Sequence, residues 1–233
     1  RRLNLHILFT RPELDSVYLA KKFIQLGHQV SIFPVLNIVK KNIININFST
    51  YHSVVFTSSN AVLCLDQEGS SSIRCYCVGS ATAEQARKKG FTDIVTAGGD
   101  YQQLKEIILN LSNKTDGKFL YLRGEYISND LEKDLTDEGY QVDSFVNYTT
   151  FPNPDFDQQT LQIFKDQNID LIFIYSKRSA EHLLKLIFNN QLESKCNLIQ
   201  LRCISENVFH PLQKVKWKNI KIFSPGNEEF SLD

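Results

Sequence analysis

The stretch Val54-Val55-Phe56-Thr57-Ser58-Ser59-Asn60-Ala61-Val62 decides how this chain is interpreted. Its first three residues, apolar and β-branched or aromatic, predict a buried strand, and the apolar run that begins at residue 61 predicts a helix. The polar turn between them would place Ser59 or Asn60 at the helix N-cap. Hydroxyls, an amide and unpaired backbone N–H groups would meet there, which suits a carboxylate or phosphate. The alternative is an ordinary cap that serves only its own backbone.

The composition excludes several classes of protein. A chain of 233 residues is long enough for one large or two small domains, and 42% hydrophobic with 22% charged residues is typical of a soluble globular protein. Lys plus Arg equals Asp plus Glu at 26 each, so no overall field favours nucleic acid or a membrane, and an anion must be held locally. The longest apolar runs, such as 171–175, are too short to span a bilayer, and the N-terminus has no signal-like core. We therefore expect a cytoplasmic protein.

The cysteines and histidines predict no metal site. The five cysteines are odd in number and show no C-x-x-C spacing, and Cys75 and Cys77 occupy alternate positions of one expected strand. We expect reduced thiols in the core. The five histidines are scattered and form no H-E-x-x-H pattern.

Expected strands alternate with expected helices along the chain. The strands are 7–9, 29–33, 54–57, 75–78, 94–96, 119–122, 141–145, 170–175, 201–204 and 219–223. The helices are 14–26, one from 60, 80–89, one ending near 111, one ending at 138, 156–166, 178–188 and 206–214. Two extended passages, 34–40 and 147–155, interrupt the alternation. This pattern predicts an α/β fold with parallel sheets and right-handed crossovers.

The chain contains an internal repeat. Thr-Arg-Pro-Glu at 10–13, followed by apolar positions 19, 23, 30 and 33 and by Gly27, recurs in the same spacing as Leu-Arg-Gly-Glu at 122–125, followed by 131, 135, 142 and 145 and by Gly139. Residues 55–58 match 173–176, and residues 77–79 match 203–205 more weakly. We infer two related five-stranded halves. They are either tandem domains, 1–112 and 113–233, or the first two strands complete the sheet built by the last three, with 34–40 and 145–151 as a double connection.

Polar residues follow the expected strands repeatedly, and ligands of open parallel sheets bind outside the carboxyl ends of strands. The candidate binding residues are Thr10, Arg11, Thr57, Ser58, Ser59, Asn60, Gly79, Ser80, Thr82, Arg123, Gly124, Ser176, Lys177 and Ser205. Two facing halves would present up to six such polar strand ends to one cleft, which suits a ligand with several carboxylates. A structural ion pair is the alternative for Arg11 with Glu13 and for Arg123 with Glu125, and a solvated helix start is the alternative for Lys177.

Other chemistries lack their motifs. G-x-G-x-x-G, the P-loop pattern and G-x-S-x-G are all absent. Tyr148 lies in the second extended passage between Asn147 and Thr149. Plain strand packing is the usual role of such a tyrosine, but one at a hinge is also placed to act as a weak acid.

Several of these motifs together resemble the uroporphyrinogen-III synthase family. They are Thr-Arg-Pro at 10–12, Pro-Val-Leu at 34–36, Phe-Thr-Ser-Ser-Asn-Ala-Val at 56–62, Val-Gly-Ser-Ala-Thr-Ala at 78–83, Leu-Arg-Gly-Glu at 122–125 and Asn-Tyr-Thr-Thr at 147–150. The resemblance extends from the first strand to about Ser205. Departures occur near its end, where Asn207 and Phe209 replace the usual Arg and Ala of the Ser-Glu-Arg-Val-Ala segment.

The resemblance implies the crossed arrangement and a reaction. One domain would comprise 1–36 plus 152–233 and the other 41–145, joined at 37–40 and 146–151. Linear hydroxymethylbilane would lose its hydroxyl, invert its last pyrrole ring and close, without a cofactor. By similarity, Tyr148 protonates the leaving hydroxyl, while Ser58, Ser59, Asn60, Gly79, Thr82, Arg123, Ser176 and Ser205 line the cleft. We expect a monomer with this tetrapyrrole as its partner. The alternative function is a two-domain module that binds a polycarboxylate without catalysis.

Overall fold

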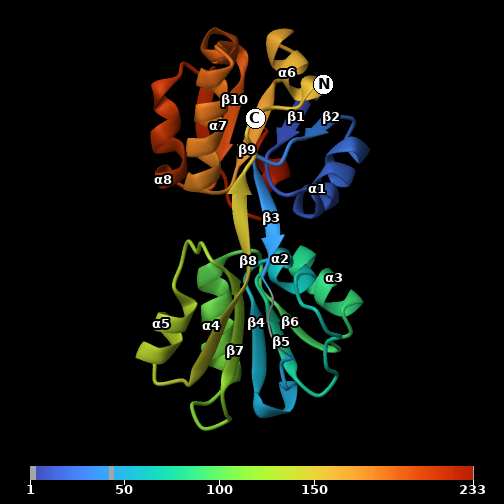
Figure 1. The fold of residues 1–233 in the computed structure, drawn as a ribbon, viewed down its shortest axis with the longest axis vertical. Helices are drawn as coiled ribbons and strands as arrows, with labels where there is room; N and C mark the ends of the chain where they lie inside the picture. Colours follow the sequence, from blue (N-terminus) through green and yellow to red (C-terminus); the bar gives the residue numbers. More distant parts are fainter. Residues whose placement is uncertain (1–3, 42–44, 233) are drawn as a thin grey trace. The chain divides into compact units, whose positions relative to one another are not determined.

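The computed structural model describes residues 4–41 and 45–232, and its contacts divide the chain into two compact units. The first unit comprises Arg1–Asn37 and Phe151–Asp233. Its parallel sheet has the order β11-β10-β9-β1-β2 (Figure 1). The strands are β1 (His6–Phe9), β2 (Gln29–Ile32), β9 (Leu171–Ile174), β10 (Gln200–Cys203) and β11 (Asn219–Ile222). Because β1 pairs with β9, strands from the two ends of the sequence share one sheet, which a tandem arrangement does not allow.

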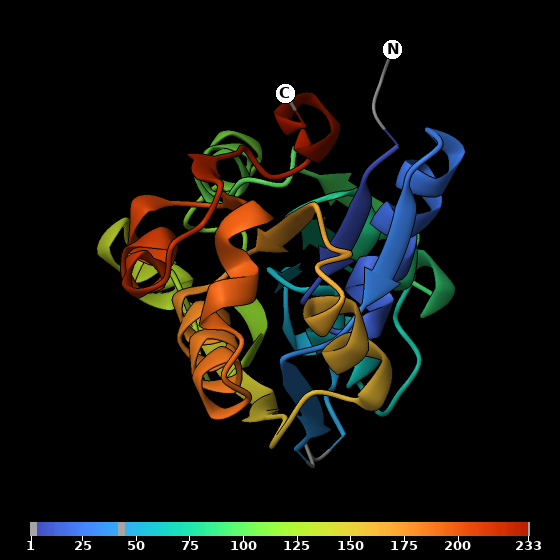
Figure 2. The same cartoon turned by 90° about the horizontal axis from the view of Figure 1, so that it is seen from above.

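Helices cover both faces of this first sheet. One face packs with α6 (Gln158–Lys165) and α7 (Lys177–Asn189) around Leu8 and Ile172, and the other packs with α1 (Glu13–Gln25) around Ile7 and Phe9 (Figure 2). Alternate residues of a strand point to opposite faces, which explains why neighbours in β1 enter different cores. The remaining elements are α8 (Glu206–Phe209) and the 3₁₀ turns η2 (Glu193–Leu198), η3 (His210–Lys214) and η4 (Glu228–Ser231).

The second unit, Ile38–Thr150, contains a six-stranded sheet of order β3-β8-β7-β4-β5-β6. Its strands are β3 (Leu36–Lys40), β4 (Ser53–Phe56), β5 (Arg74–Cys77), β6 (Asp93–Thr96), β7 (Phe119–Gly124) and β8 (Val142–Pro152). One face packs with α2 (Ser59–Leu63) and α3 (Ser80–Lys88), and the other with α4 (Tyr101–Leu111) and α5 (Leu131–Asp137). A 3₁₀ turn, η1 (Phe48–Thr50), precedes β4.

The α/β class and the two sheets with flanking helices are confirmed, with one strand more than expected. Residues 36–40 of the first extended passage form β3, and β8 continues from the expected strand into the second passage, where β3 pairs with it. The backbone N–H and C=O groups of the two extended segments form hydrogen bonds with each other, so the connection is part of the sheet. The helix expected over 206–214 is divided into α8 and η3 because Pro211 has no N–H to donate to the preceding turn.

The internal repeat appears in the strand pairing. The sheet order β2-β1-β9-β10-β11 corresponds strand by strand to β8-β7-β4-β5-β6. The registers correspond as well. Phe9 lies opposite Phe173 as Tyr121 lies opposite Val55, and Cys203 lies opposite Ile174 as Cys77 lies opposite Phe56. The glycines that end α1 and α5, Gly27 and Gly139, both have left-handed φ, at 88° and 91°.

The five cysteines are free and buried, as expected. Among residues 4–41 and 45–232, none of the helices combines the length and the apolar character that a membrane span needs.

Candidate functional site

The turn after β4 is a helix start capped by Ser58. The Ser58 hydroxyl accepts a hydrogen bond from the Asn60 N–H at 3.1 Å, so the N-cap is Ser58 and the expectation of Ser59 or Asn60 is wrong. The hydroxyl oxygen of Thr57, which follows β4, is 3.1 Å from the hydroxyl oxygen of Tyr121 in the neighbouring strand β7. Burial raises the pKa of Tyr121, which keeps this phenol protonated.

The turn after β5 lies against the Ser58 turn. Ser59 and Thr82 are both buried, and their hydroxyl oxygens are 3.3 Å apart, so they link α2 to α3. Gly79 is the N-cap of α3 and makes no side-chain cap. A Cβ atom on Gly79 would lie 3.2 Å from the Cα of Gly99, so the close approach of two backbones accounts for this glycine. Ser80, the first residue of α3, is exposed.

Tyr148 of β8 lies beside Gly124 of β7, where the register of the two strands shifts. A Cβ atom on Gly124 would lie 2.7 Å from Tyr148 Cζ and 2.9 Å from the phenol oxygen, so the ring covers the glycine. The ring also packs against the core cluster that contains Leu122. Gly124 ends β7, and β7 is the neighbour of β4. Tyr148 therefore lies at the carboxyl ends of these parallel strands, as the Ser58 turn does.

Arg123 and Glu125 do not make the ion pair considered from sequence. The Arg123 guanidinium donates to Ser144 Oγ at 2.9 Å and to the Gly124 carbonyl at 3.1 Å. Glu125 instead contacts Lys41 Nζ at 2.9 Å and accepts a hydrogen bond from the Thr149 hydroxyl. Both side chains contact β8, but at different residues, Ser144 for Arg123 and Thr149 for Glu125, and sequence distance does not reveal this.

In the first unit, the side chains of Thr10 and Arg11, which follow β1, make contacts within the protein. The buried Thr10 hydroxyl donates to the Phe173 carbonyl at 2.9 Å. Arg11 lies 4.4 Å over the Tyr175 ring and 3.7 Å from Asp15, so its partner is Asp15 one helical turn on and the alternative of Glu13 is wrong. Sequence reasoning did not single out Tyr175, which follows β9 and packs against the rings of Phe173 and Phe223.

Tyr175 also joins the end of the chain to this edge. Its hydroxyl donates to Glu228 Oε1 at 3.0 Å, and Glu228 is only 3% exposed. Burial, followed by the nearby Glu228 charge, raises the pKa of Tyr175 well above its ordinary value. No local sequence pattern indicates that Tyr175 and Glu228, which are far apart in the sequence, are in contact.

The remaining candidates of the first unit lie at helix starts. Ser176 caps α7 by accepting from the Ser179 N–H at 3.1 Å, and Ser205 is the N-cap of α8 without a side-chain cap. Lys177 is exposed and lies 3.8 Å from Glu181 on the helix surface, consistent with the solvated-start alternative. The structure thus gathers Thr10, Arg11, Ser176 and Ser205 after the neighbouring strands β1, β9 and β10.

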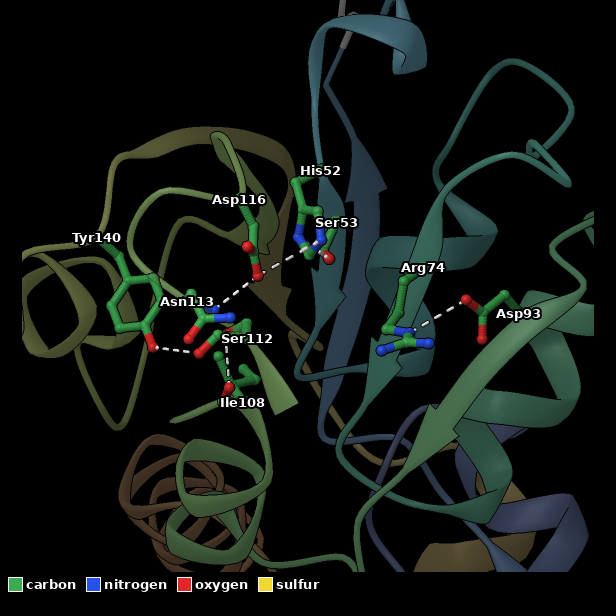
Figure 3. A network of polar contacts seen from close by, with 9 residues as sticks. All are labelled: His52, Ser53, Arg74, Asp93, Ile108, Ser112, Asn113, Asp116 and Tyr140. Atoms are coloured by element: carbon green, nitrogen blue, oxygen red, sulfur yellow. Dashed lines mark hydrogen bonds and ion pairs between the residues drawn. The ribbon is translucent and has the colours of Figure 1, made fainter. Parts of the chain in front are cut away.

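A polar network at the opposite, amino-terminal edge of the second sheet has a structural role (Figure 3). Ser53 Oγ is 2.9 Å from His52 Nδ1, and His52 Nε2 is 4.0 Å from Asp116. This order of residue types resembles a hydrolytic triad, but Ser53 is 0% exposed, so no substrate reaches it. Tyr140 donates to the Ser112 carbonyl at 2.9 Å in the same network. Within 4–41 and 45–232, no three His, Cys, Asp or Glu side chains are arranged to hold a metal ion.

One solved structure supports the fold. The crystal structure of uroporphyrinogen-III synthetase from Helicobacter pylori is similar, with a TM-score of 0.57 and 14% identity over 97% of this chain and 95% of that one. A mutant uroporphyrinogen III synthase from Thermus thermophilus matches with a TM-score of 0.47 and 15% identity, over 93% and 92% of the two chains. A search of curated proteins gives no significant match. The sequence model described as uroporphyrinogen-III synthase HemD matches residues 18–224. The chain therefore belongs to the uroporphyrinogen-III synthase HemD family.

Proposed function

We propose that this protein is an active uroporphyrinogen-III synthase, which converts hydroxymethylbilane to the type III macrocycle. The observation that carries the proposal is the family match over residues 18–224. The arrangement of polar residues supports it, because hydroxyls, a guanidinium and backbone N–H groups follow neighbouring strands in each unit. Such groups suit the eight carboxylates of the bilane.

In the proposed reaction, the Tyr148 hydroxyl gives its proton to the hydroxymethyl oxygen of the bilane. The C–O bond breaks, water leaves and the pyrrole nitrogen lone pair stabilises the resulting azafulvenium carbon. The azafulvenium carbon then bonds to the substituted α-carbon of the last ring, which gives a spiro intermediate. The bond from that α-carbon to its original bridge breaks, the bridge carbon bonds to the other α-carbon of the inverted ring, and the proton lost there returns to the Tyr148 phenolate. Most of the rate enhancement would come from holding the chain in the conformation that leads to inversion.

The proposal assigns substrate contacts to polar positions of both units. These are Thr10, Arg11, Thr57, Ser58, Ser59, Asn60, Gly79, Ser80, Thr82, Arg123, Gly124, Ser176, Lys177 and Ser205, with backbone N–H groups important where the side chain is already engaged, as in Thr10 and Ser59. We further propose that the domains are 1–36 plus 152–233 and 41–145, joined at 37–40 and 146–151, and that the protein acts as a cytoplasmic monomer.

The test supplies freshly generated hydroxymethylbilane, oxidises the products and separates the type I and type III porphyrins by chromatography. The bilane closes to type I without an enzyme, so a dominant type III peak is the expected result. Only type I from the folded protein, together with tight binding of the bilane, would replace the proposal with the polycarboxylate-binding module.

The same assay tests the role of Tyr148. A general acid contributes on the order of 100-fold or more to a rate, so Tyr148→Phe should lower kcat by about that factor without abolishing turnover. Tyr140→Phe is the matched control, because this hydroxyl bonds the Ser112 carbonyl at the opposite edge of the sheet. An unchanged kcat in Tyr148→Phe would remove the tyrosine from the mechanism but leave the type III activity standing.

A further inference from the structure

The Tyr148 ring occupies the space that a side chain at position 124 would fill. A Cβ atom there would lie 2.7 Å from Cζ, 2.9 Å from Cε2 and 2.9 Å from the hydroxyl oxygen of Tyr148. Contacts below 3.0 Å are repulsive, so any residue other than glycine must displace the phenol end of the ring. Position 124 is buried within β7, which leaves the added carbon no other space.

The backbone on both sides of Tyr148 is fixed, so the strand does not move to relieve this contact. The Tyr148 carbonyl accepts from the Glu125 N–H at 3.0 Å, and the Thr149 hydroxyl donates to the Glu125 carboxylate. The Asn147 amide, 1% exposed, donates to the Ala61 carbonyl of α2 at 2.6 Å. The ring, which turns about two side-chain bonds, is the part that yields.

We propose that Gly124 is a positioning residue for Tyr148: the missing side chain lets the phenol lie flat on β7 with its hydroxyl at the carboxyl edge of the sheet. The proposal rests on the function proposed above, in which that hydroxyl delivers a proton. Gly124 would then act on the reaction by placing the Tyr148 hydroxyl, in addition to its proposed contact with the substrate. Asn147 holds the same segment against α2, the helix that Ser58 caps.

The test is Gly124→Ala, assayed for type III product. A misplacement of about 1 Å in a catalytic group can cost on the order of 100-fold, so we expect kcat to fall at least about tenfold, while KM changes by less than about threefold. A merely structural defect would instead lower the amount of active enzyme and the melting temperature. Gly69→Ala is the matched control, because its Cβ would lie 2.7 Å from the Phe91 ring in the core of the same unit. It should lower stability and leave kcat unchanged.

A double-mutant cycle distinguishes positioning from an independent effect. Once Tyr148 is Phe there is no hydroxyl to place, so Gly124→Ala should lower kcat little further in that background. If the fold-losses in kcat of the two single variants multiply in the double variant, the proposal is wrong. It is also wrong if Gly124→Ala keeps the wild-type kcat while Tyr148→Phe is slow. A crystal structure of Gly124→Ala covers the case in which the protein makes no type III product. A ring displaced from β7 supports the positioning role, and an unmoved ring refutes it, whatever the reaction.

Discussion

At the scale of single residues, the Tyr101 hydroxyl controls the ionisation of a carboxylate. It donates to Asp134 Oδ2 at 2.6 Å, and this hydrogen bond, with Lys105 Nζ at 3.6 Å, lowers the pKa of Asp134. The folded-state pKa lies below the unfolded one, so the stabilisation is present above an unfolded value of about 3.9 and is lost as the pH falls through the folded value.

Tyr101→Phe should therefore raise the pKa of Asp134 towards its ordinary value and reduce the loss of stability in acid. The measurement is a ¹³C NMR titration of the side-chain carboxyl groups between about pH 2 and 6, a window around the ordinary value. Tyr140→Phe serves as the control, because its hydroxyl bonds a carbonyl and not a carboxylate. An Asp134 titration identical in Tyr101→Phe and wild type would contradict the assignment.

At the scale of elements, the Asp100 carboxylate determines where α4 begins. It accepts from the Gln102 N–H at 2.6 Å and the Gln103 N–H at 3.4 Å, and the helix it starts places Leu104 and Ile108 in the core. Loss of an N-cap costs about 1 kcal/mol, so Asp100→Ala should lower the free energy of unfolding by about that amount in urea titrations. Asp100→Asn keeps an acceptor oxygen and should lose much less, and equal losses would contradict a capping role.

The sequence predicts the existence of elements better than their ends. All ten expected strands form, and the central ones are the clearest in the sequence because apolar runs such as Leu171–Ile174 are completely buried. The sequence predicts only a connection at β3, because this strand is mostly exposed and forms by pairing with β8, which is distant in sequence. Helix ends were less predictable. The N-cap of α2 is Ser58 and not the expected Ser59 or Asn60, because a run of Ser, Ser and Asn leaves the backbone geometry of the cap open.

The candidate site was predicted as a set of positions but not as a set of contacts. Strand ends identify residues such as Ser58 and Ser176 because parallel strands all end at one edge. The partners come from segments distant in sequence, as with Tyr148 on Gly124 or Glu228 against Tyr175, and no local pattern records them. The functional roles of these residues still depend on the proposed reaction.

At the scale of the whole molecule, the strand pairing predicts which fragments fold. Residues 38–150 contain β4 to β7 and most of β3 and β8, so this fragment should unfold cooperatively in circular dichroism. Residues 151–233 lack β1 and β2, which leaves the edge of β9 and the apolar side chains of Leu171 and Phe173 without their partners. This fragment should not fold alone. A cooperative transition in residues 151–233 would show that the first sheet does not depend on its N-terminal strands.

The equal registers of the two sheets have a consequence for the origin of the chain. In chain order, β1, β2, β4, β5 and β6 form one copy of the repeat, and β7 to β11 form the next, yet each sheet combines two strands of one copy with three of the other. A reciprocal exchange of strand pairs between two tandem repeats would give this composition, with β3 and the end of β8 as the connection. If the two halves descend from one repeat, a single copy would hold all five strands in one open sheet, and the length and stiffness of the segment between its second and third strands would decide between a self-contained monomer and an exchanged pair.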